Sequence, residues 1–512
     1  MKNPIPKVFS AEIDGIEAGC VEVEADLNVG LHSFNIVGLA DKAVSEAKER
    51  VNSALKNSGI KPPSRENRRI TINLAPADVK KAGSRFDLPI AVAYLLASGQ
   101  ISNFNTGDKM FAGELSLDGK VRPVTGTLSM ALLAERFGFS EFFVSAENAN
   151  EAAMVSSLRV YGVSSLKDLI HHLEGRLKIA PTIHARPGYS PPHFAPVLLS
   201  DIHGQEGAKR ALTVAAAGGH NILMSGPPGT GKTMLANSLI SILPPLSEEE
   251  RLEITKIHSV AGLVPNGFPL QNRPFRAPHH SASTVSIVGG GATPRPGEIS
   301  LAHRGVLFLD ELPEFHKDVL ESLRQPIEQG CVHVARAKKT SVFPARFMFV
   351  AAMNPCPCGH LEDEGRECSC SMREILKYQK KISGPLLDRI DIQMHVPRIP
   401  IEELRKKSGG SSEESVRERV RAAREIQKTR FEKIGKPIRT NAEMDSKTVD
   451  VVVSPDRESE YFIKKAIETS FLSPRGYYRV LKIARTIADL DGSTETKKEH
   501  FAEALRYKIN SE

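Results

Sequence analysis

Residues 226–233, Gly-Pro-Pro-Gly-Thr-Gly-Lys-Thr, decide the fold of the middle of this 512-residue chain. They match the pattern G-x-x-x-x-G-K-[ST] at every fixed position. The apolar run at 221–225 is typical of a buried parallel strand, and residues 234–240 are typical of the opening of a helix. A strand, a glycine-rich turn and a helix in this order predict a phosphate-binding loop in an α/β domain.

Each part of this loop has its own task in the predicted site. Lys232 reaches the β- and γ-phosphates of a nucleoside triphosphate, and the Thr233 hydroxyl binds Mg²⁺. The alternative is a glycine-rich turn that binds nothing, and the lysine, the threonine and both flanking elements argue against it. We therefore expect ATP and Mg²⁺ as cofactors, with the turn residues around the phosphates: Gly226, Pro227, Pro228, Gly229, Thr230 and Gly231.

Two further apolar runs supply the polar residues that such a site needs. Residues 305–309 end in Asp310 and Glu311, which we expect to hold Mg²⁺ and to polarise the attacking water, respectively. A buried structural acid pair is the alternative. Residues 347–353 end in Asn354, which can reach the γ-phosphate and the water. Ligands in open α/β sheets bind at the carboxyl edge of the strands, where all three residues are predicted to lie.

Composition limits the class of protein. The chain is too long for one core and suggests about three domains. It has 40% hydrophobic residues, no apolar run near the roughly 18 needed to cross a bilayer, and no signal-peptide pattern, so we expect a cytoplasmic protein without a membrane partner. The net charge of +7 permits a polyanionic partner. Residues 254–297 and 329–361 contain no acid, which fits either a surface facing a polyanion or buried, glycine-rich loops.

The pattern of the chain divides it into three blocks and a linker. Residues 1–178 mix strand and helix patterns: Asp41 is a candidate N-cap of a helix that runs to about residue 56, and 69–74 alternate like a half-buried strand. Residues 179–196 are a proline-rich linker. Residues 197–395 hold the phosphate-binding loop, and residues 396–512 are helical in pattern.

The middle block resembles the AAA+ ATPases, and more narrowly their magnesium-chelatase-like branch, on residues 273–280, 295–305 and 385–391. The resemblance implies a parallel-sheet core, a helical lid and a ring, usually a hexamer. It places Asn354 at the position called sensor 1 and makes Arg389 an arginine finger that acts on a neighbouring subunit; an internal Asp388–Arg389 ion pair is the alternative. Arg475 matches the sensor 2 arginine of the lid, expected at the γ-phosphate of its own subunit.

Residues 76–134 resemble the Lon protease domain, an α+β fold, but without its catalytic dyad. Arg85 occupies the position of the nucleophilic serine, and Leu128 occupies that of the lysine. A serine–lysine dyad needs a hydroxyl and an amine that acts as its base. Ser84 is adjacent but out of register. We therefore expect a Lon-like fold at 1–178 without peptidase activity.

The order of these blocks resembles the ComM/YifB family across essentially the whole chain. The resemblance implies a ring helicase that drives branch migration of DNA junctions in recombination and natural transformation. The alternative is a magnesium-chelatase-type ATPase subunit that remodels a protein partner. The third hypothesis is an ATP-dependent peptidase. Arg85 and Leu128 argue against it, because they replace the serine and the lysine of the catalytic dyad.

A basic turn is the candidate DNA contact. Residues 331–335 and 340–343 are predicted strands, and the branch places a hairpin before sensor 1 in the central pore. Arg336, Lys338 and Lys339 at its tip would contact phosphates without reading sequence. The alternative is an exposed basic turn. Residues 287–295, rich in glycine, are a second candidate pore loop.

Four of the six cysteines form two C-x-C pairs, Cys356 with Cys358 and Cys368 with Cys370. Four clustered thiolates can hold a tetrahedral ion, for which Zn²⁺ is usual in a reducing compartment. His360 could replace one thiol, and four unpaired thiols on a loop are the alternative. We expect a structural Zn²⁺, because the loop between the pairs is polar.

Overall fold

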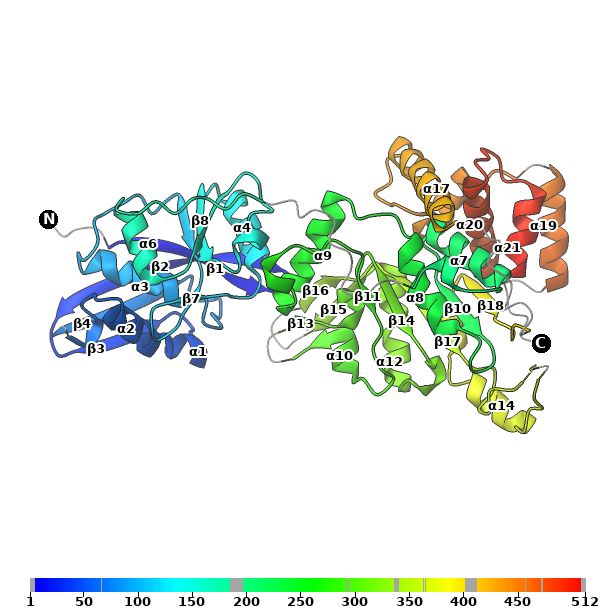
Figure 1. The fold of residues 1–512 in the computed structure, drawn as a ribbon, viewed down its shortest axis with the longest axis horizontal. Coiled ribbons are helices and arrows are strands. Elements are labelled where there is room, and N and C mark those ends of the chain that lie inside the picture. The colour runs from blue at the N-terminus through cyan, green and yellow to red at the C-terminus, as the bar shows by residue number, and fades with distance from the viewer. Residues whose placement is uncertain are drawn as a thin grey trace.

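The fold was obtained as a computed structural model that describes residues 5–65, 67–184, 197–291, 294–335, 340–361, 363, 365–400, 412–455, 457–470 and 473–507. The molecule is elongated, with the N-terminal strands at one end and the C-terminal helices at the other (Figure 1). In the described part of the chain, no helix has both the length and the apolar character that crossing a bilayer requires.

The N-terminal part is built on a seven-stranded mixed sheet with the order β3-β4-β2-β1-β5-β8-β9. Antiparallel pairing joins β1 to β2 and β2 to β4, and the other neighbours are parallel. The strands are β1 (Lys7–Asp14), β2 (Glu17–Val29), β3 (Ser33–Val37), β4 (Arg68–Ala75), β5 (Lys109–Phe111), β8 (Glu141–Ser145) and β9 (Arg159–Val163). A small hairpin joins β6 (Glu114–Leu115) to β7 (Val121–Arg122).

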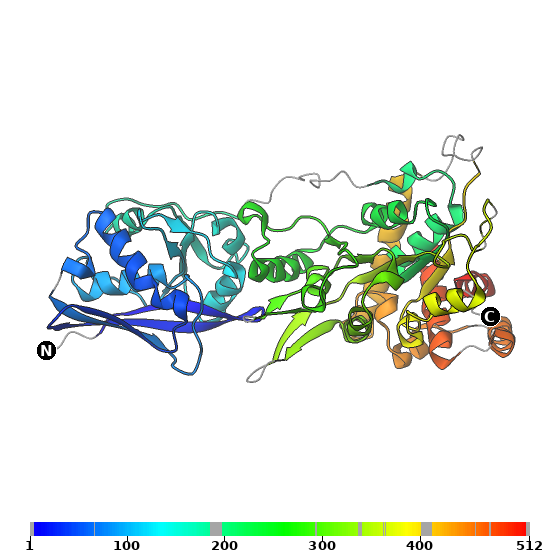
Figure 2. The ribbon, with the colours of Figure 1, turned by 90° about the horizontal axis from the view of Figure 1, so that it is seen from below.

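In Figure 2, the long blue strands of this part run along its lower side with helices above them. The helices are α1 (Lys42–Ser45), α2 (Ala47–Asn57), α3 (Asp87–Ala97), α4 (Thr127–Arg136), α5 (Ala149–Ala152) and α6 (Leu166–Leu173). At β5 and β8 they cover both faces of the sheet, because Phe111 and Phe143 lie in the apolar core of α2, α3 and α6, whereas Met110 and Phe142 lie in that of α4 and α5. Asp41 caps α1 as predicted, because its carboxylate accepts the N–H of Val44 at 2.8 Å. The helix breaks at Glu46 and resumes as α2, so the predicted single helix is two. The predicted strand at 69–74 is β4.

The central part is a five-stranded, wholly parallel sheet with the order β11-β14-β17-β10-β18. Its inner strands are buried along their whole length, since helices cover both faces, and they therefore read as continuous apolar runs. The strands are β10 (Ile222–Ser225), β11 (Phe275–Arg276), β14 (Val306–Leu309), β17 (Met348–Met353) and β18 (Ile392–His395). This mixed α/β architecture with a parallel sheet confirms the predicted fold class.

Helices and short hairpins surround the parallel sheet. The helices are α7 (Glu206–Gly218), α8 (Lys232–Ile242), α9 (Glu248–Ala261), α10 (Thr284–Val288), α11 (Glu298–Leu301), α12 (Lys317–Ser322), α13 (Arg324–Gln329), α14 (Met372–Gln379) and α15 (Gly384–Leu387). The hairpins are β12 (Gly289–Gly290) with β13 (Arg295–Pro296), and β15 (Cys331–Ala335) with β16 (Thr340–Pro344).

The C-terminal part is helical, as its pattern predicted. Its helices are α17 (Glu413–Lys433), α18 (Ser446–Val452), α19 (Arg457–Ser470), α20 (Pro474–Leu490) and α21 (Lys498–Arg506). One continuous apolar core joins α17 and α20 to α7 and α8. We call this helical part the lid.

The N-terminal part is attached to the centre by direct packing on α9. The Gly126 N–H donates to the Ser259 carbonyl oxygen at 3.0 Å, and Lys256 pairs with Glu17 at 2.6 Å. Buried Glu151 accepts the Leu128 N–H at 2.8 Å and the hydroxyl of Ser259. The two parts are thus joined by packing and hydrogen bonds as well as by the chain at 179–196, of which residues 185–196 lie outside the described residues.

Candidate nucleotide site

The residues predicted to bind ATP and Mg²⁺ meet at the carboxyl edge of the central sheet. The Thr233 hydroxyl donates to Asp310 Oδ2 at 2.7 Å. The Lys232 ammonium lies 3.3 Å from Asn354 Oδ1. These contacts connect the loop after β10 with the ends of β14 and β17, because β17 lies between β14 and β10 in the sheet. Lys232, Thr233, Asp310 and Asn354 therefore form one cluster.

The glycines of the loop allow this close arrangement. Gly229 and Gly231 have φ of +78° and +85°, in the left-handed region that residues with a Cβ rarely adopt. A Cβ at Gly226 would lie 2.2 Å from the Val396 carbonyl oxygen, just after β18. The chain therefore needs glycine here to turn sharply between β10 and α8.

Lys232 is held inside its own loop. Its ammonium donates to the carbonyl oxygens of Gly226 and Pro227, both at 2.8 Å, and the residue is 8% exposed. Burial lowers the pKa of Lys232, and the carboxylate of Asp310 opposes that shift. The Lys232 ammonium can bind the phosphate oxygens of a nucleotide when its side chain rotates away from these carbonyl oxygens and out of the glycine-rich turn.

Glu311 stands at the end of β14 with a strained backbone. Its φ is +51°, an uncommon value for a residue with a side chain, and its N–H donates to Asp310 Oδ1 at 2.9 Å. Its carboxylate is 56% exposed, so it is open to water. An exposed carboxylate in this position can accept a proton from water.

His280 is a neighbour of this site that the sequence reasoning did not assign. Its Nδ1 lies 3.5 Å from Glu311 Oε2, and its ring packs against His279 with the ring centroids 4.0 Å apart. The sequence contains a signal for this residue: His279 and His280 are adjacent and lie within the acid-free stretch 254–297. An imidazole in this position can orient the Glu311 carboxylate or hold a proton beside it.

The four clustered cysteines lie beside the same site. Their Sγ atoms are all within 4.8 Å of one another, and Cys356 is fully buried. N–H groups of the loop, from His360 and Ser369, lower the pKa of the Cys358 thiol. His360 instead bonds Asp363 through Nδ1 at 2.9 Å. The donor set of four thiols fits the tetrahedral thiolate site that Zn²⁺ prefers.

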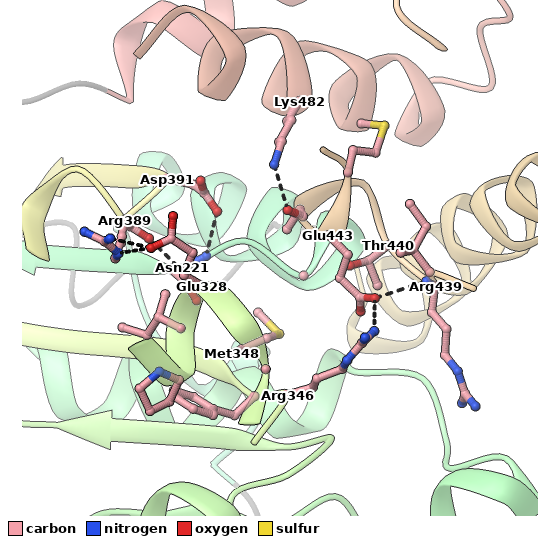
Figure 3. Close-up of a pocket in the computed structure, with 18 of the residues that line it drawn as sticks. Asn221, Glu328, Arg346, Met348, Arg389, Asp391, Arg439, Thr440, Glu443 and Lys482 are labelled. Carbon is pink, nitrogen blue, oxygen red and sulfur yellow. Dashed lines mark hydrogen bonds and ion pairs between the residues drawn. The ribbon is translucent and has the colours of Figure 1, made fainter. Parts of the chain in front are cut away.

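Arg389 and Arg475 line a cleft of about 710 Å³ at the opposite edge of the sheet. Figure 3 shows Arg389 beside Glu328 in this cleft. Arg389 donates to Glu328 at the end of α13 and to the Pro385 carbonyl oxygen at 2.6 Å, and Arg475 pairs with Glu328 at 3.5 Å. The carbonyl oxygen of Arg389 accepts from Asn221, which immediately precedes β10, whereas the phosphate-binding loop follows β10.

The expectation that Arg475 contacts the phosphates of its own subunit is therefore corrected. The lid packs on α7 through α17 and α20, and Arg479 of α20 donates to the Ile390 carbonyl oxygen at 2.9 Å, just before β18, so the start of α20 lies at the amino edge of the sheet. The length of β10, roughly 13 Å, separates that edge from the loop. Arg475 and Arg389 thus share one face of the chain, away from the candidate nucleotide site of the same chain.

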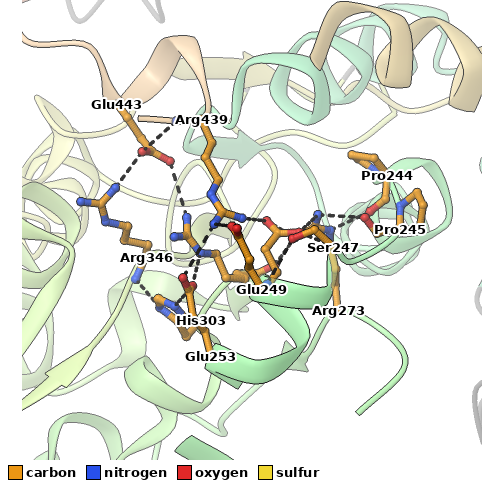
Figure 4. Close-up of polar contacts among 12 residues, drawn as sticks. Pro244, Pro245, Ser247, Glu249, Glu253, Arg273, His303, Arg346, Arg439 and Glu443 are labelled. Atoms are coloured by element: carbon orange, nitrogen blue, oxygen red, sulfur yellow. Dashed lines mark hydrogen bonds and ion pairs between the residues drawn. The ribbon is translucent and has the colours of Figure 1, made fainter. Parts of the chain in front are cut away.

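A network of ion pairs forms the other wall of this cleft and ties α9 to the lid (Figure 4). Arg439, on the lid side, lies 3.0 Å from Glu249 and 3.4 Å from Glu250. Glu253 pairs with Arg304 at 2.8 Å and with His303 at 3.1 Å. The N-terminal part and the lid therefore contact the same helix, α9.

The hairpin predicted to contact DNA is present as β15 and β16. Its tip, with Arg336, Lys338 and Lys339, lies outside the described residues. A Cβ at Gly15, in the turn between β1 and β2, would lie 3.3 Å from Ser341 Cβ in β16. The N-terminal sheet therefore reaches the base of this hairpin.

At Arg85 and Leu128, the two positions that the sequence aligns with the Lon dyad, the structure shows ion pairing and apolar packing. Arg85 pairs with Glu12 at 3.8 Å, and both side chains are largely buried. Ser84 donates to Glu114, and Leu128 is buried in the apolar core. The side chains at the two aligned positions thus have structural partners.

Comparison with known proteins finds relatives that match nearly the whole chain. Three family models match: the magnesium chelatase subunit ChlI over residues 198–404, the subunit ChlI of Mg-chelatase over 23–148, and the ChlI C-terminal part over 410–508. The competence protein ComM of Haemophilus influenzae is 44% identical over 507 residues, which cover 98% of this chain and 97% of that protein. The uncharacterized protein YifB of Salmonella typhimurium is 42% identical over 96% of this chain and 95% of its own. A magnesium-chelatase 67 kDa subunit of Heliobacterium mobile is 29% identical over 32% of this chain and 29% of its own.

Proposed function

Because the chain belongs to the ComM/YifB family of magnesium-chelatase-like AAA+ ATPases, we propose that it is a ring motor that couples ATP hydrolysis to movement on DNA. The observation that carries the proposal is the meeting of Lys232, Thr233, Asp310 and Asn354 at one edge of the sheet. We propose that the motor works in the cytoplasm.

Each residue of the site has a separate role in ATP hydrolysis. Lys232 binds the β- and γ-phosphates, and Thr233 and Asp310 hold Mg²⁺, which neutralises phosphate charge when bound. Glu311, open to water beside Asp310, takes the proton of the attacking water. Asn354, within 3.3 Å of Lys232, orients that water at the γ-phosphate.

The arginines on the opposite edge complete the site of a neighbouring subunit. Arg389 and Arg475 meet at Glu328, on a face that their own phosphate-binding loop does not reach. In a closed ring, head-to-tail contacts bring such a face onto the next subunit's nucleotide edge. The two guanidinium groups then stabilise charge that develops on the γ-phosphate, an effect worth roughly 10³-fold or more for an arginine finger. We propose a hexamer.

DNA is the proposed track of this motor. One relative that matches almost the whole chain is named a competence protein, which connects it with DNA uptake. Branch migration of DNA junctions in recombination is the activity we propose here. The tip of the hairpin formed by β15 and β16, with Arg336, Lys338 and Lys339, would contact phosphates in the pore.

The second candidate is a chelatase-type subunit that remodels a protein partner. The matched models carry that name, but two magnesium-chelatase 67 kDa subunits cover 32% and 54% of this chain, while the competence protein covers 98%. The relatives that share the whole arrangement therefore favour the DNA motor.

ATPase measurements with and without DNA test the proposal. We expect single-stranded or branched DNA to raise the turnover rate, and Lys338→Glu with Lys339→Glu to weaken DNA binding and flatten its salt dependence. Lys232→Ala and Glu311→Gln should abolish turnover. Absence of both DNA binding and stimulation would refute the motor, and full turnover in Lys232→Ala would refute the assigned site.

A further inference from the structure

The loop that carries the cysteines packs directly against the phosphate-binding loop. A Cβ at Gly359, between the two C-x-C pairs, would lie 2.8 Å from Pro228 Cδ and 3.8 Å from Asn354 Cγ. Gly359 has a φ of +82°, which favours glycine. The close approach therefore puts the backbone of the cysteine loop in contact with two predicted nucleotide-site residues.

The four thiols have the spacing of one tetrahedral ion. The Sγ atom of Cys368 lies 3.7 Å from that of Cys356 and 3.6 Å from that of Cys358. A zinc ion with Zn–S bonds of about 2.3 Å holds its sulfur atoms about 3.8 Å apart. Two thiols also accept backbone N–H groups: Leu361 donates to Cys356 at 3.3 Å, and Cys358 donates to Cys370 at 3.4 Å. These contacts fix the Cys356 and Cys370 sulfur atoms within the loop.

The chain on both sides of the cysteines is part of the nucleotide site or its frame. Asn354 stands two residues before Cys356, and the Pro355 carbonyl oxygen accepts from Gln379 of α14 at 3.1 Å. Asp363, beside His360, pairs with Arg398 at 3.0 Å, just after β18. The loop is thus anchored to the sheet at two strands and lies over the turn between β10 and α8.

We propose that Cys356, Cys358, Cys368 and Cys370 bind one Zn²⁺, and that this ion is a positioning element of the nucleotide site. The metal joins the two C-x-C pairs, and so it holds Gly359, which lies between them, against Pro228 and Asn354. Loss of the metal frees both contacts, weakens nucleotide binding and slows hydrolysis, while the sheet core stays folded. The inference rests on the proposed function only in taking residues 226–233 as the nucleotide loop.

Metal content and nucleotide affinity, measured on the full-length protein, test the two halves of the inference. We expect about one zinc per chain in the unmodified protein and in Cys331→Ser, and none in Cys368→Ser with Cys370→Ser. Cys331 is a matched control because it is a partly buried cysteine in β15, outside the cluster. The double variant should bind a fluorescent ATP analogue about tenfold more weakly, with unchanged helix content by circular dichroism. Absence of zinc from the purified unmodified protein, after zinc supplementation, would overturn the site.

A second variant separates positioning from folding. Gly359→Ala keeps all four thiols but places a methyl group against Pro228, so it should retain zinc and still bind the analogue several-fold more weakly. In addition, Co²⁺ bound in place of Zn²⁺ should show thiolate charge-transfer bands that shift when the analogue binds to the unmodified protein but not to Lys232→Ala. Unchanged affinity in Gly359→Ala together with unchanged cobalt bands would overturn the coupling. If Lys232→Ala binds the analogue normally, the assignment of the nucleotide loop fails instead.

Discussion

Replacing Asp489 by alanine tests how the lid holds the helix that carries Arg475. Asp489 lies near the C-terminal end of α20, and its side chain is fully buried. Its Oδ2 accepts from Arg430 of α17 and from Asn441, both at 2.9 Å. Its Oδ1 accepts from Arg485 at 2.8 Å, and the Arg485 side chain is 2% exposed. One carboxylate thus balances two guanidinium groups in a closed site.

The magnitude follows from what the substitution leaves behind. Breaking a buried ion pair by removing one partner costs about 3–5 kcal/mol, because an uncompensated buried charge remains. Arg485 keeps its bond to the Thr494 carbonyl oxygen at 2.8 Å, and Arg430 keeps Asn441 at 3.3 Å, so we place the cost near 4 kcal/mol. At about 1.4 kcal/mol for each factor of ten, the opening of α20 should become roughly 10³-fold more frequent.

Hydrogen exchange measured by mass spectrometry resolves this local opening. Amides of α20 and α17 should exchange roughly 10³-fold faster in Asp489→Ala, while those of the N-terminal sheet should not change. Asp491→Ala is the matched control: its side chain is 49% exposed and lies 3.9 Å from Arg210, so it should change exchange less than about fivefold. An increase below tenfold in Asp489→Ala, or one equal to the control, would show that Asp489 does not hold α20 in place.

Three further predictions concern the two edges of the sheet and α9. Glu328→Gln removes the carboxylate that holds Arg389 and Arg475 within their own subunit, and so frees both arginines to contact a neighbouring subunit. ATPase activity should therefore reach half its maximum at a roughly fivefold lower protein concentration. A higher half-maximal concentration would contradict the proposed action in a neighbouring subunit. Thr233→Ala removes the hydroxyl beside Asp310 and should raise the Mg²⁺ concentration that half-saturates turnover by about tenfold, with an unchanged requirement counting against the metal assignment. Burial alone would raise the pKa of Glu253, but hydrogen bonds from His303 and Arg304 lower it from 4.5 to about 2. Ionised Glu253 therefore stabilises the fold above pH 4.5, and this contribution is lost as the pH falls toward 2; melting temperatures of Glu253→Gln should fall less steeply over that range, and parallel curves would exclude the effect.

The local elements of the site were predictable because each depends on a few consecutive residues. The strand, turn and helix around 226–233 were read from apolar runs and glycines, and they are β10, the loop and α8. The strand that precedes Asp310 was recognised in the same way and is β14. Parallel strands align their carboxyl ends, so the contact between Thr233 and Asp310 at 2.7 Å follows from the order of the strands.

Other placements depend on packing between segments far apart in the chain. No local pattern at Ser473–Leu490 says which edge of the sheet its helix will face, and the expected position of Arg475 was wrong for that reason. The docking of the N-terminal sheet on α9 likewise depends on two surfaces that meet only in the folded chain.

The glycine-rich loop, its carboxylate partner, the four clustered thiols and the order of the parts follow from the amino-acid sequence alone, because short-range backbone geometry and side-chain chemistry set these features. The tertiary structure alone decided that Arg389 and Arg475 share Glu328 on the edge away from the loop, and that Gly359 rests on Pro228. Those contacts arise where the apolar faces of distant helices and strands pack together, and such packing depends on surface shape that no run of neighbouring residues encodes.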